Sequence, residues 1–374
     1  MSVGALDGIK VFEFASYVSG PYAGMLLSDL GAEVVKVETP EGGDPFRMWG
    51  KDDYNGTFGA LNRNKKSVTL DLKTEPGTAR KLMLGADVVI ENMRAGAMER
   101  FGLGYESLAA DNPRLVYCSI TGFGSQGPYR DRPGYDTVGQ AVSGLLGVLT
   151  DRKAPQPMGV SLSDHLAGVF AAYGVLAALM ARTASGRGQK VETSLLEATL
   201  SFLGENAATF FEDRKVPSRQ TRCQRAQVFT FTAGDGLPFA VHLSSPEKFW
   251  RGLLAAMGHE ALATDERFRT RAQRVENYEA LRAELASAFQ SRPRAEWLKL
   301  LGAQDVPCGP LNDLEEVFAD PQVIALDMRK NLPHRSRGTV SVIGNPVRLS
   351  ATPPRVETAA PDLGAHNDLL AAPK

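Results

Sequence analysis

The first 40 residues switch between two hydrophobic patterns. Residues 9–14 (IKVFEF) are strand-like, and residues 20–32 (GPYAGMLLSDLGA) carry their apolar side chains at helical spacing. Residues 33–40 (EVVKVETP) are strand-like again. This order predicts a βαβ unit, which favours a parallel sheet with a right-handed crossover.

The alternation of strand and helix patterns continues through about the first 200 residues. Further strand-like stretches lie at 67–72, 86–92 and 115–122, with a helical stretch at 78–84. This order predicts a doubly wound α/β domain with a Rossmann-like layer structure. Turn formers concentrate in two segments that follow strands, where open α/β sheets bind ligands: 41–45 (EGGDP) and 122–135 (GFGSQGPYRDRPGY).

The hydrophobic pattern changes after about residue 213. Residues 215–227 (KVPSRQTRCQRAQ) are basic, polar and poorly periodic, as is typical of a linker or a ligand-facing loop. A strand pair at 228–243 and several helices follow, so the sequence predicts a second, smaller α+β domain. We expect the strand-like pair at 338–350 to return to the first domain. The predicted organisation is a large domain at 1–213, a linker at 214–227, a small domain at 228–318, and a linker with a C-terminal return to the large domain at 319–374.

Composition and charge exclude several classes of protein. The chain has 42 Lys and Arg against 43 Asp and Glu, so no overall basic charge points to a nucleic-acid partner. Three cysteines are too few for a disulfide framework or a zinc site. The longest apolar run, 166–181, is too short for a membrane span and predicts a buried helix. Because the N-terminal segment does not resemble a signal peptide, we expect a cytoplasmic protein without membrane association.

Several motifs of nucleotide-binding and hydrolytic enzymes are absent. The sequence lacks GxGxxG after its first strand, and it lacks both the phosphate-binding loop GxxxxGK and the nucleophile motif GxSxG. The alternation of strands and helices by itself also suits a nicotinamide-dependent oxidoreductase, but the missing dinucleotide motif counts against that class. Neither HxxxH nor paired cysteine spacing occurs, so we expect no metal site.

The stretch 159–168 (GVSLSDHLAG) places a carboxylate at the start of the apolar run. Asp164 has two interpretations: it caps the helix N-terminus, or it does chemistry as a nucleophile. Either Ser163 or Asp164 could serve as the cap, so the two roles do not exclude each other. The neighbouring His165 is interpreted as a structural or supporting side chain.

Five segments together resemble the family III CoA-transferases, of the formyl-CoA transferase and carnitine CoA-transferase type. They are 6–47, 62–74 (NRNKKSVTLDLKT), 89–103 (VIENMRAGAMERFGL), 159–198 and 306–311 (VPCGPL). The resemblance runs in the expected order from about Leu6 to Leu370. It implies a Rossmann-like large domain built from both ends of the chain, a small middle domain, and an interlocked homodimer whose linkers thread through the partner subunit.

The resemblance also implies a mechanism, because the family's nucleophilic aspartate aligns with Asp164. That carboxylate attacks an acyl-CoA thioester, and a mixed anhydride then leads to an aspartyl-CoA thioester. A small carboxylic acid, the second substrate, takes the CoA from this intermediate. Coenzyme A enters as part of the acyl-CoA substrate, and no tightly bound cofactor is implied. Because a helix N-terminus favours negative charge, we expect it to keep Asp164 ionised.

Positional match to the family implies where CoA binds on the large domain. Arginine and lysine suit this role because CoA carries several phosphate charges. Each of these side chains has an ordinary solvated surface role as its alternative. Thr39 departs from the family pattern, since some members carry arginine there. The implied CoA contacts are Val18, Ser19, Thr39, Leu70, Lys73, Asn92, Met93, Arg94, Arg100, Arg132 and Tyr135.

The α-methylacyl-CoA racemases share this fold and are the alternative function. They pair the same aspartate with a histidine, whose position is occupied here by Tyr135. Tyrosine has an unperturbed pKa near 10, which makes it a poor proton shuttle at neutral pH. Transferases commonly carry an aromatic and an acidic residue here, so Tyr135 and Asp136 favour transfer. Asp136 is interpreted either as a carboxylate that supports the reaction or as a cap on the helix that follows.

One basic cluster is a candidate binding site for the acceptor acid. Residues 215–227 contain Arg219, Arg222 and Arg225, where the family places loops close to the substrate. Because arginine binds carboxylates through two hydrogen bonds, the hypothesis is that Arg222 and Arg225 hold a small dicarboxylic acid. The alternative is a solvated linker.

Overall fold

The protein divides into two compact units. The structure, a computed structural model, describes residues 3–50, 55–244 and 247–370. The larger unit joins both ends of the chain, and the smaller unit holds most of the segment between them. The larger unit comprises Met1–Leu146, Gln156–Ala207 and Gln322–Lys374, and the smaller comprises Gly147–Pro155 and Ala208–Pro321.

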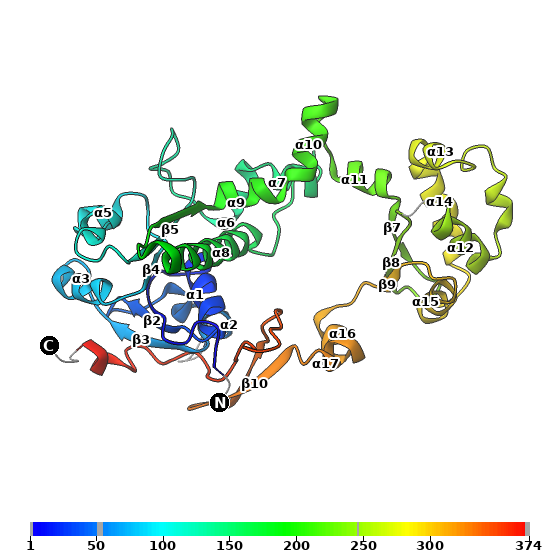
Figure 1. Cartoon of the computed structure of the whole chain (residues 1–374). Coiled ribbons are helices and arrows are strands. Elements are labelled where there is room, and N and C mark those ends of the chain that lie inside the picture. The colour runs from blue at the N-terminus through cyan, green and yellow to red at the C-terminus, as the bar shows by residue number, and fades with distance from the viewer. Residues whose placement is uncertain (1–2, 51–54, 245–246, 371–374) are drawn as a thin grey trace. The chain divides into compact units, whose positions relative to one another are not determined.

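Six parallel strands form the central sheet of the larger unit (Figure 1). They are β1 (Lys10–Phe14), β2 (Glu33–Glu38), β3 (Lys65–Thr69), β4 (Val88–Glu91), β5 (Val116–Thr121) and β6 (Lys190–Ser194). Their order is β3-β2-β1-β4-β5-β6, and every neighbouring pair is parallel. The predicted parallel α/β architecture is confirmed. The sequence pattern missed β6, whose short KVETS segment is mostly polar and pairs with β5 only after the long helix α8 has crossed the sheet.

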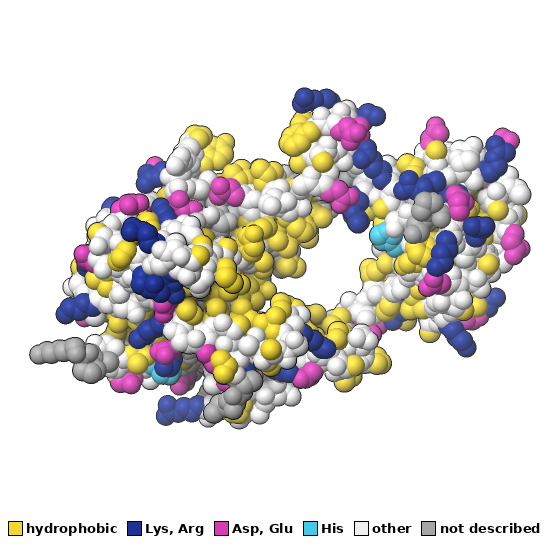
Figure 2. Space-filling model, viewed as in Figure 1, with side chains coloured by type: hydrophobic (Ala, Val, Ile, Leu, Met, Phe, Trp, Pro, Cys, Tyr) yellow, Lys and Arg dark blue, Asp and Glu magenta, His cyan; other side chains and the backbone are white. Residues whose placement is uncertain are grey.

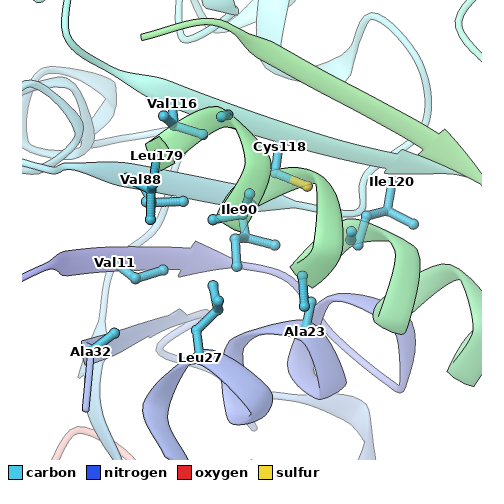
Figure 3. Close-up of a cluster of buried hydrophobic side chains, with 14 of the residues drawn as sticks. Val11, Ala23, Leu27, Ala32, Val88, Ile90, Val116, Cys118, Ile120 and Leu179 are labelled. Carbon is cyan, nitrogen blue, oxygen red and sulfur yellow. The ribbon is translucent and has the colours of Figure 1, made fainter. Parts of the chain in front are cut away.

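Helices α1 (Ser19–Asp29) and α8 (Leu162–Ser185) cover one face of this sheet. Figure 3 shows side chains of β1, β4 and β5 pointing at Ala23 and Leu27 of α1 and at Leu179 of α8. Small residues bring the two helices together, because a Cβ added to Gly168 of α8 would lie 2.7 Å from the Ser19 carbonyl oxygen. This close packing places the first turn of α8 beside the loop after β1.

The opposite face of the sheet is covered by α3 (Pro76–Leu84), α4 (Ala97–Arg100) and α5 (Tyr105–Ala109). The result is a three-layer αβα arrangement, as the alternating pattern predicts. The remaining elements of this unit up to residue 207 are η1 (Pro45–Trp49), α2 (Gly56–Asn62), α6 (Asp136–Val142), α9 (Leu195–Phe202) and the start of α7 (Leu145–Leu149) and of α10 (Gly204–Asp213).

The C-terminal segment also belongs to the larger unit. It contains α17 (Pro321–Ala325), an antiparallel hairpin of β10 (Arg329–His334) and β11 (Gly338–Ile343), and η3 (Asn367–Leu370). The predicted strand pair at 338–350 is therefore corrected. Residues 338–343 form the second strand, and their partner precedes them in the sequence. The pattern missed β10 because RKNLPH contains only one buried residue, Leu332.

The smaller unit has its own apolar core around a three-stranded antiparallel sheet. Its strands are β7 (Val228–Thr232), β8 (Pro238–His242) and β9 (Cys308–Pro310), and the first two form the predicted pair at 228–243. The helices are α11 (Arg219–Ala226), α12 (Lys248–Met257), η2 (Glu260–Ala263), α13 (Arg271–Glu276), α14 (Tyr278–Phe289), α15 (Arg294–Ala303) and α16 (Leu314–Ala319). The segment that the sequence predicts as a linker or ligand-facing loop contains a helix, α11, because Ser218 begins it through a capping box with Thr221.

Helix α8 is long and apolar enough to cross a membrane by composition. Its buried side chains pack on the parallel sheet, among them Ala171, Val175 and Leu179. It is therefore a core helix of the α/β unit.

Candidate active site

A pocket of about 250 Å³ opens at the carboxyl ends of four strands in the larger unit. Its walls come from the segments that follow β1, β4, β5 and β6, together with the first turn of α8. The strand order reverses between β1 and β4, and such a switch point is where doubly wound sheets bind ligands. The lining residues are Phe14, Ser16, Tyr17, Val18, Ser19, Asn92, Met93, Arg94, Ile120, Thr121, Gly122, Pro133, Gly134, Tyr135, Asp164 and Leu195.

Asp164 lines this pocket from the third position of α8. Ser161 is the N-cap residue and makes no side-chain cap, so neither Ser163 nor Asp164 caps the helix, and that interpretation is corrected. Asp164 is half-buried, and no hydrogen bond to its carboxylate is found within the described part of the chain. The carboxylate is therefore available for chemistry.

The electrostatic environment of Asp164 differs from the expectation. Burial, and then the negative charge of Asp136, raise the pKa of Asp164 from 3.8 to about 7. The helix N-terminus favours the charged form. Burial and a like charge outweigh it, because they remove water from the carboxylate and add repulsion. At neutral pH the carboxylate is thus partly protonated and more basic than an ordinary aspartate.

Asp136 reaches across from α6 to cap α8. Its Oδ1 accepts a hydrogen bond from the Asp164 backbone N–H at 3.2 Å, and its Oδ2 accepts one from Gln140 Nε2 at 2.5 Å. The N–H groups of a first helical turn have no partner within the helix, so a carboxylate from elsewhere satisfies one of them. The expected cap on the following helix is corrected: α6 has Tyr135 as its N-cap residue and no side-chain cap.

Two tyrosines line the same pocket. The rings of Tyr17 and Tyr135 meet edge to face, with centroids 5.8 Å apart, and Tyr135 remains 61% exposed. Tyr17 has a backbone φ of +65°, which is uncommon for a bulky residue. Burial, and then the adjacent Tyr135 hydroxyl, raise the pKa of Tyr17. The Tyr17 phenol therefore stays protonated near neutral pH, as a hydrogen-bond donor rather than a proton shuttle.

Asn92 joins two walls of the pocket. Its Oδ1 accepts a hydrogen bond from the Ser16 backbone N–H at 3.0 Å, and its Nδ2 donates to the Ser16 carbonyl at 2.8 Å and to Ser19 Oγ at 3.2 Å. The Asn92 side chain, which the resemblance implies as a CoA contact, thus already makes hydrogen bonds within the protein. Of the other implied CoA contacts, those that also line the pocket are Val18, Ser19, Met93, Arg94 and Tyr135.

The remaining implied CoA contacts lie outside the pocket walls. Leu70 is a core residue with 2% exposure, so its side chain is closed to a ligand. The backbone N–H of Lys73 is held by Asp71, Thr39 Oγ1 donates to the Glu41 carbonyl, and Arg132 stacks on Tyr129. Arg100 is exposed, and its Nη1 would lie 3.8 Å from a Cβ added to Gly96. These positions form no single cluster around the pocket.

The basic cluster lies in the smaller unit. Arg225 donates to Asp213 Oδ2 at 2.6 Å and to Thr209 Oγ1 at 3.1 Å, so its guanidinium already has a carboxylate partner. Arg222 occupies the same helix, α11. Both residues belong to a unit other than the one that carries the pocket.

His165 contacts the start of its own helix and Tyr22 of α1. Its Nδ1 lies 2.7 Å from the Ser161 carbonyl oxygen, and its ring packs on Tyr22 with centroids 4.8 Å apart. Sequence reasoning missed Gln140 and Gly139, which have no chemical signature of their own. Their contacts become visible only in the structure, where α6 packs against α8.

The doubly wound sheet and the available carboxylate at its switch point define an α/β enzyme. The chain belongs to CoA-transferase family III, which matches residues 6–367. It is 36% identical to the succinate–glutarate CoA-transferase of Agrobacterium fabrum over 96% of this chain and 93% of that protein. It is 37% identical to the acetyl-CoA:oxalate CoA-transferase of Acetobacter aceti over 98% of this chain and 95% of that protein.

Solved structures agree with this assignment. A CAIB/BAIF family protein from Brucella suis superposes with a TM-score of 0.87 at 36% identity, covering 99% of both chains. The Mycobacterium tuberculosis protein Rv3272 superposes with a TM-score of 0.86 at 33% identity, again over 99% of both chains. The recognised family and its fold are thereby confirmed, and the protein is a family III CoA-transferase.

Proposed function

We propose that this enzyme moves CoA from an acyl-CoA thioester to a small dicarboxylic acid through a thioester on Asp164. The observation that carries the proposal is Asp164, which lines a pocket at the switch point and whose carboxylate has no hydrogen-bond partner among the described residues. An ionised carboxylate is a competent covalent nucleophile, and a covalent intermediate divides one difficult transfer into easier steps.

The first half-reaction makes the enzyme thioester. An Asp164 oxygen attacks the thioester carbonyl and the C–S bond breaks, which gives a mixed anhydride and CoA thiolate. The thiolate then attacks the Asp164 carbonyl, and the donor acid leaves as its carboxylate. In the second half-reaction the acceptor carboxylate attacks the Asp164 thioester, and the released thiolate attacks the acceptor carbonyl of the new anhydride. Asp164 leaves as a free carboxylate, and no net proton or electron is exchanged.

The neighbours of Asp164 suit these steps. Its pKa of about 7 leaves a substantial ionised fraction at neutral pH and a more basic nucleophile than an ordinary aspartate. The phenols of Tyr17 and Tyr135 line the same pocket and can donate hydrogen bonds to oxyanions that form there. Asp136 holds the backbone of the nucleophile at 3.2 Å.

The dicarboxylic acid is supported by the names of similar proteins. Besides the two relatives above, the chain is 37% identical to the succinyl-CoA–D-citramalate CoA-transferase of Chloroflexus aurantiacus, over 97% of this chain and 92% of that protein. Binding of the acid by Arg222 and Arg225 stays a proposal. If Arg225 takes part, it has to exchange or share its present partner, Asp213.

A homodimer belongs to the same proposal. Helix α8 is apolar on the face away from the sheet as well, where Val169, Tyr173, Leu176 and Met180 are 36–71% exposed. Figure 2 shows apolar side chains gathered on the part of the larger unit where Figure 1 places α8. A second copy of the chain is the occupant that the family resemblance implies, and we extend the proposal to its interlocked form.

Mass spectrometry of the intact protein tests the covalent step. After incubation with succinyl-CoA, acetyl-CoA or oxalyl-CoA, we expect an adduct of CoA on the peptide that contains Asp164, and we expect hydroxylamine to remove it. Asp164→Ala should form no adduct. No adduct on the wild type with any acyl-CoA in the panel would exclude the nucleophile role.

The same incubations separate transfer from racemisation and identify the acid. Acceptors of one and two carboxylates are compared, and we expect dicarboxylates to have the higher kcat/KM. Unchanged acceptor KM in Arg222→Ala and Arg225→Ala would refute the arginine hypothesis. Exchange of the α-hydrogen of a 2-methylacyl-CoA in deuterated water, without acid-dependent transfer, would favour the racemase.

A further inference from the structure

We propose that Gln140 is a positioning residue whose amide holds the Asp136 carboxylate against the first turn of α8 and thereby sets how strongly Asp136 acts on Asp164. This inference rests on the proposed function, because it concerns the same two carboxylates. Gln140 follows Asp136 by one turn of α6 and is 1% exposed.

The Gln140 amide makes two donated bonds in two directions. Its Nε2 donates to Asp136 Oδ2 at 2.5 Å and to the Val160 carbonyl at 2.9 Å. Val160 lies in the segment that leads into α8. One buried side chain therefore ties α6, its carboxylate and the approach to the nucleophile together.

The second oxygen of Asp136 completes a closed ring of contacts. Asp136 Oδ1 accepts from the Asp164 N–H at 3.2 Å, and the chain from Asp164 back to Val160 closes the ring. Asp136 cannot rotate away without losing both hydrogen bonds. Gly139 permits this spacing, because a Cβ there would lie 3.2 Å from the Ser163 Cβ.

Folding stability by itself does not explain an amide at this position. Gln140 Oε1 is buried and has no hydrogen-bond partner among the described residues. A buried carbonyl without a partner is unfavourable, and a methionine would fill similar space without that loss. The two bonds donated by Nε2 are what the amide contributes.

The chemical consequence is where the negative charge of Asp136 lies relative to Asp164. That charge, after burial, is the second cause of the raised pKa of Asp164, and the Gln140 donor keeps it at the first turn of α8. Without the Gln140 donor, the Asp136 carboxylate turns away more readily, so its charge lies farther from Asp164 and raises the pKa of Asp164 less. The other titratable groups on the surrounding segments, which the substitution leaves in place, are Tyr17, Arg94, Tyr135, His165 and Glu197.

Carbon-13 NMR of aspartate carboxyl groups in the substrate-free, full-length protein tests the inference. The Asp164 signal is assigned by its loss in Asp164→Asn, and its titration midpoint is followed from about pH 4.5 to about pH 9, which brackets the expected value. In Gln140→Met we expect the midpoint of Asp164 to move to lower pH by about one unit, because the like charge of Asp136 is no longer held beside it. The shorter amide of Gln140→Asn should move it in the same direction by less.

Ser143→Ala is the matched control. Ser143 lies in the turn after Gln140, is buried, and donates Oγ–H to the Gln140 backbone carbonyl at 3.2 Å. It should lower the melting temperature and leave the Asp164 midpoint unchanged. An unchanged midpoint in folded Gln140→Met and Gln140→Asn would overturn the inference. Because this titration needs no turnover, it is independent of whether an Asp164 adduct forms.

Discussion

At the scale of single residues, Asp164 stands where two physical effects oppose each other. The start of α8 favours a carboxylate, whereas burial and Asp136 favour the carboxylic acid. The pKa near 7 is the balance. An enzyme that keeps a carboxyl in such surroundings loses folding stability at the pH where the group is ionised, and gains a reactive nucleophile.

Asp164→Asn is therefore predicted to inactivate the enzyme and to stabilise it above pH 7. The folded pKa lies above the unfolded value of 3.8, so the wild type loses stability as pH rises from about 4 to about 7, and the loss persists above that. Each kcal/mol recovered raises the melting temperature by about 2–4 °C in a domain of about 150–250 residues, and by less in a larger one. Melting curves at pH 4, 6 and 8 check this, and a variant that gains nothing at pH 8 would contradict it.

Gly139→Ala tests the spacing between α6 and α8. The new Cβ would lie 3.1 Å from Leu195 Cβ of α9 and 3.2 Å from Ser163 Cβ of α8, so these neighbours have to shift by a few tenths of an ångström. We expect a loss of about 1–3 kcal/mol in the free energy of unfolding, as for other overpacked sites, and slower formation of the Asp164 adduct. Urea unfolding and adduct mass spectrometry measure the two effects.

Gly302→Ala is the control for that substitution. Gly302 is also helical, in α15, and a Cβ there meets nothing within 4 Å. This variant should gain about 0.5–1 kcal/mol from helix propensity. Equal effects of the two alanines would show that Gly139 does not mark a close approach.

At the scale of elements, a buried ion network supports the wall of the pocket. Lys36 Nζ lies 3.0 Å from Glu13 Oε1, 2.7 Å from the Ala15 carbonyl and 2.9 Å from Asp44 Oδ2, with all three side chains buried. Burial disfavours the lysine charge, but Glu13 and Asp44 raise its pKa above the ordinary value. Asp44 also accepts from the Tyr17 N–H at 3.4 Å, which connects the network to the pocket.

Lys36→Met is predicted to destabilise the larger unit by about 3–5 kcal/mol, because it leaves Asp44 buried without its cation. Lys66→Ala is the matched control on the neighbouring strand. Its partner Glu33 lies 3.2 Å away, and both side chains are at least 40% exposed, so the loss should stay below about 1 kcal/mol. Chemical unfolding at pH 7 compares the two, and similar losses would contradict the argument.

At the scale of the whole molecule, the outer face of α8 predicts self-association. Tyr173→Glu and Met180→Glu place charge on residues that are 67% and 71% exposed, so the monomer should fold while the dimer is lost. Light scattering after size-exclusion chromatography measures the mass. Leu237→Glu, at a 42% exposed turn residue of the smaller unit, is the control and should stay dimeric. A wild type of 40.3 kDa in solution would refute the dimer.

The hydrophobic pattern by itself determined the layers of the larger unit. Strands buried on both faces read as apolar runs, so β1, β2, β4 and β5 are visible to within about two residues. The family motifs determined the class of enzyme. The pattern failed at α11, where a capping box begins a helix in a polar segment. It also failed at β6 and β10, which are strands because of the strands they pair with and not because of an apolar run.

Only the tertiary structure decided how the candidate site works. The sequence singles out Asp164, but a helix start looks the same whether its carboxylate is a cap or free. The packing of α6 on α8 brings Asp136 from 28 positions away to take the cap, and Gln140 to hold Asp136. Burial and like charge then reverse the expected effect of the helix terminus on Asp164. Residue types and their order establish which groups are present, whereas pKa depends on distance and exclusion of water, which only the fold supplies.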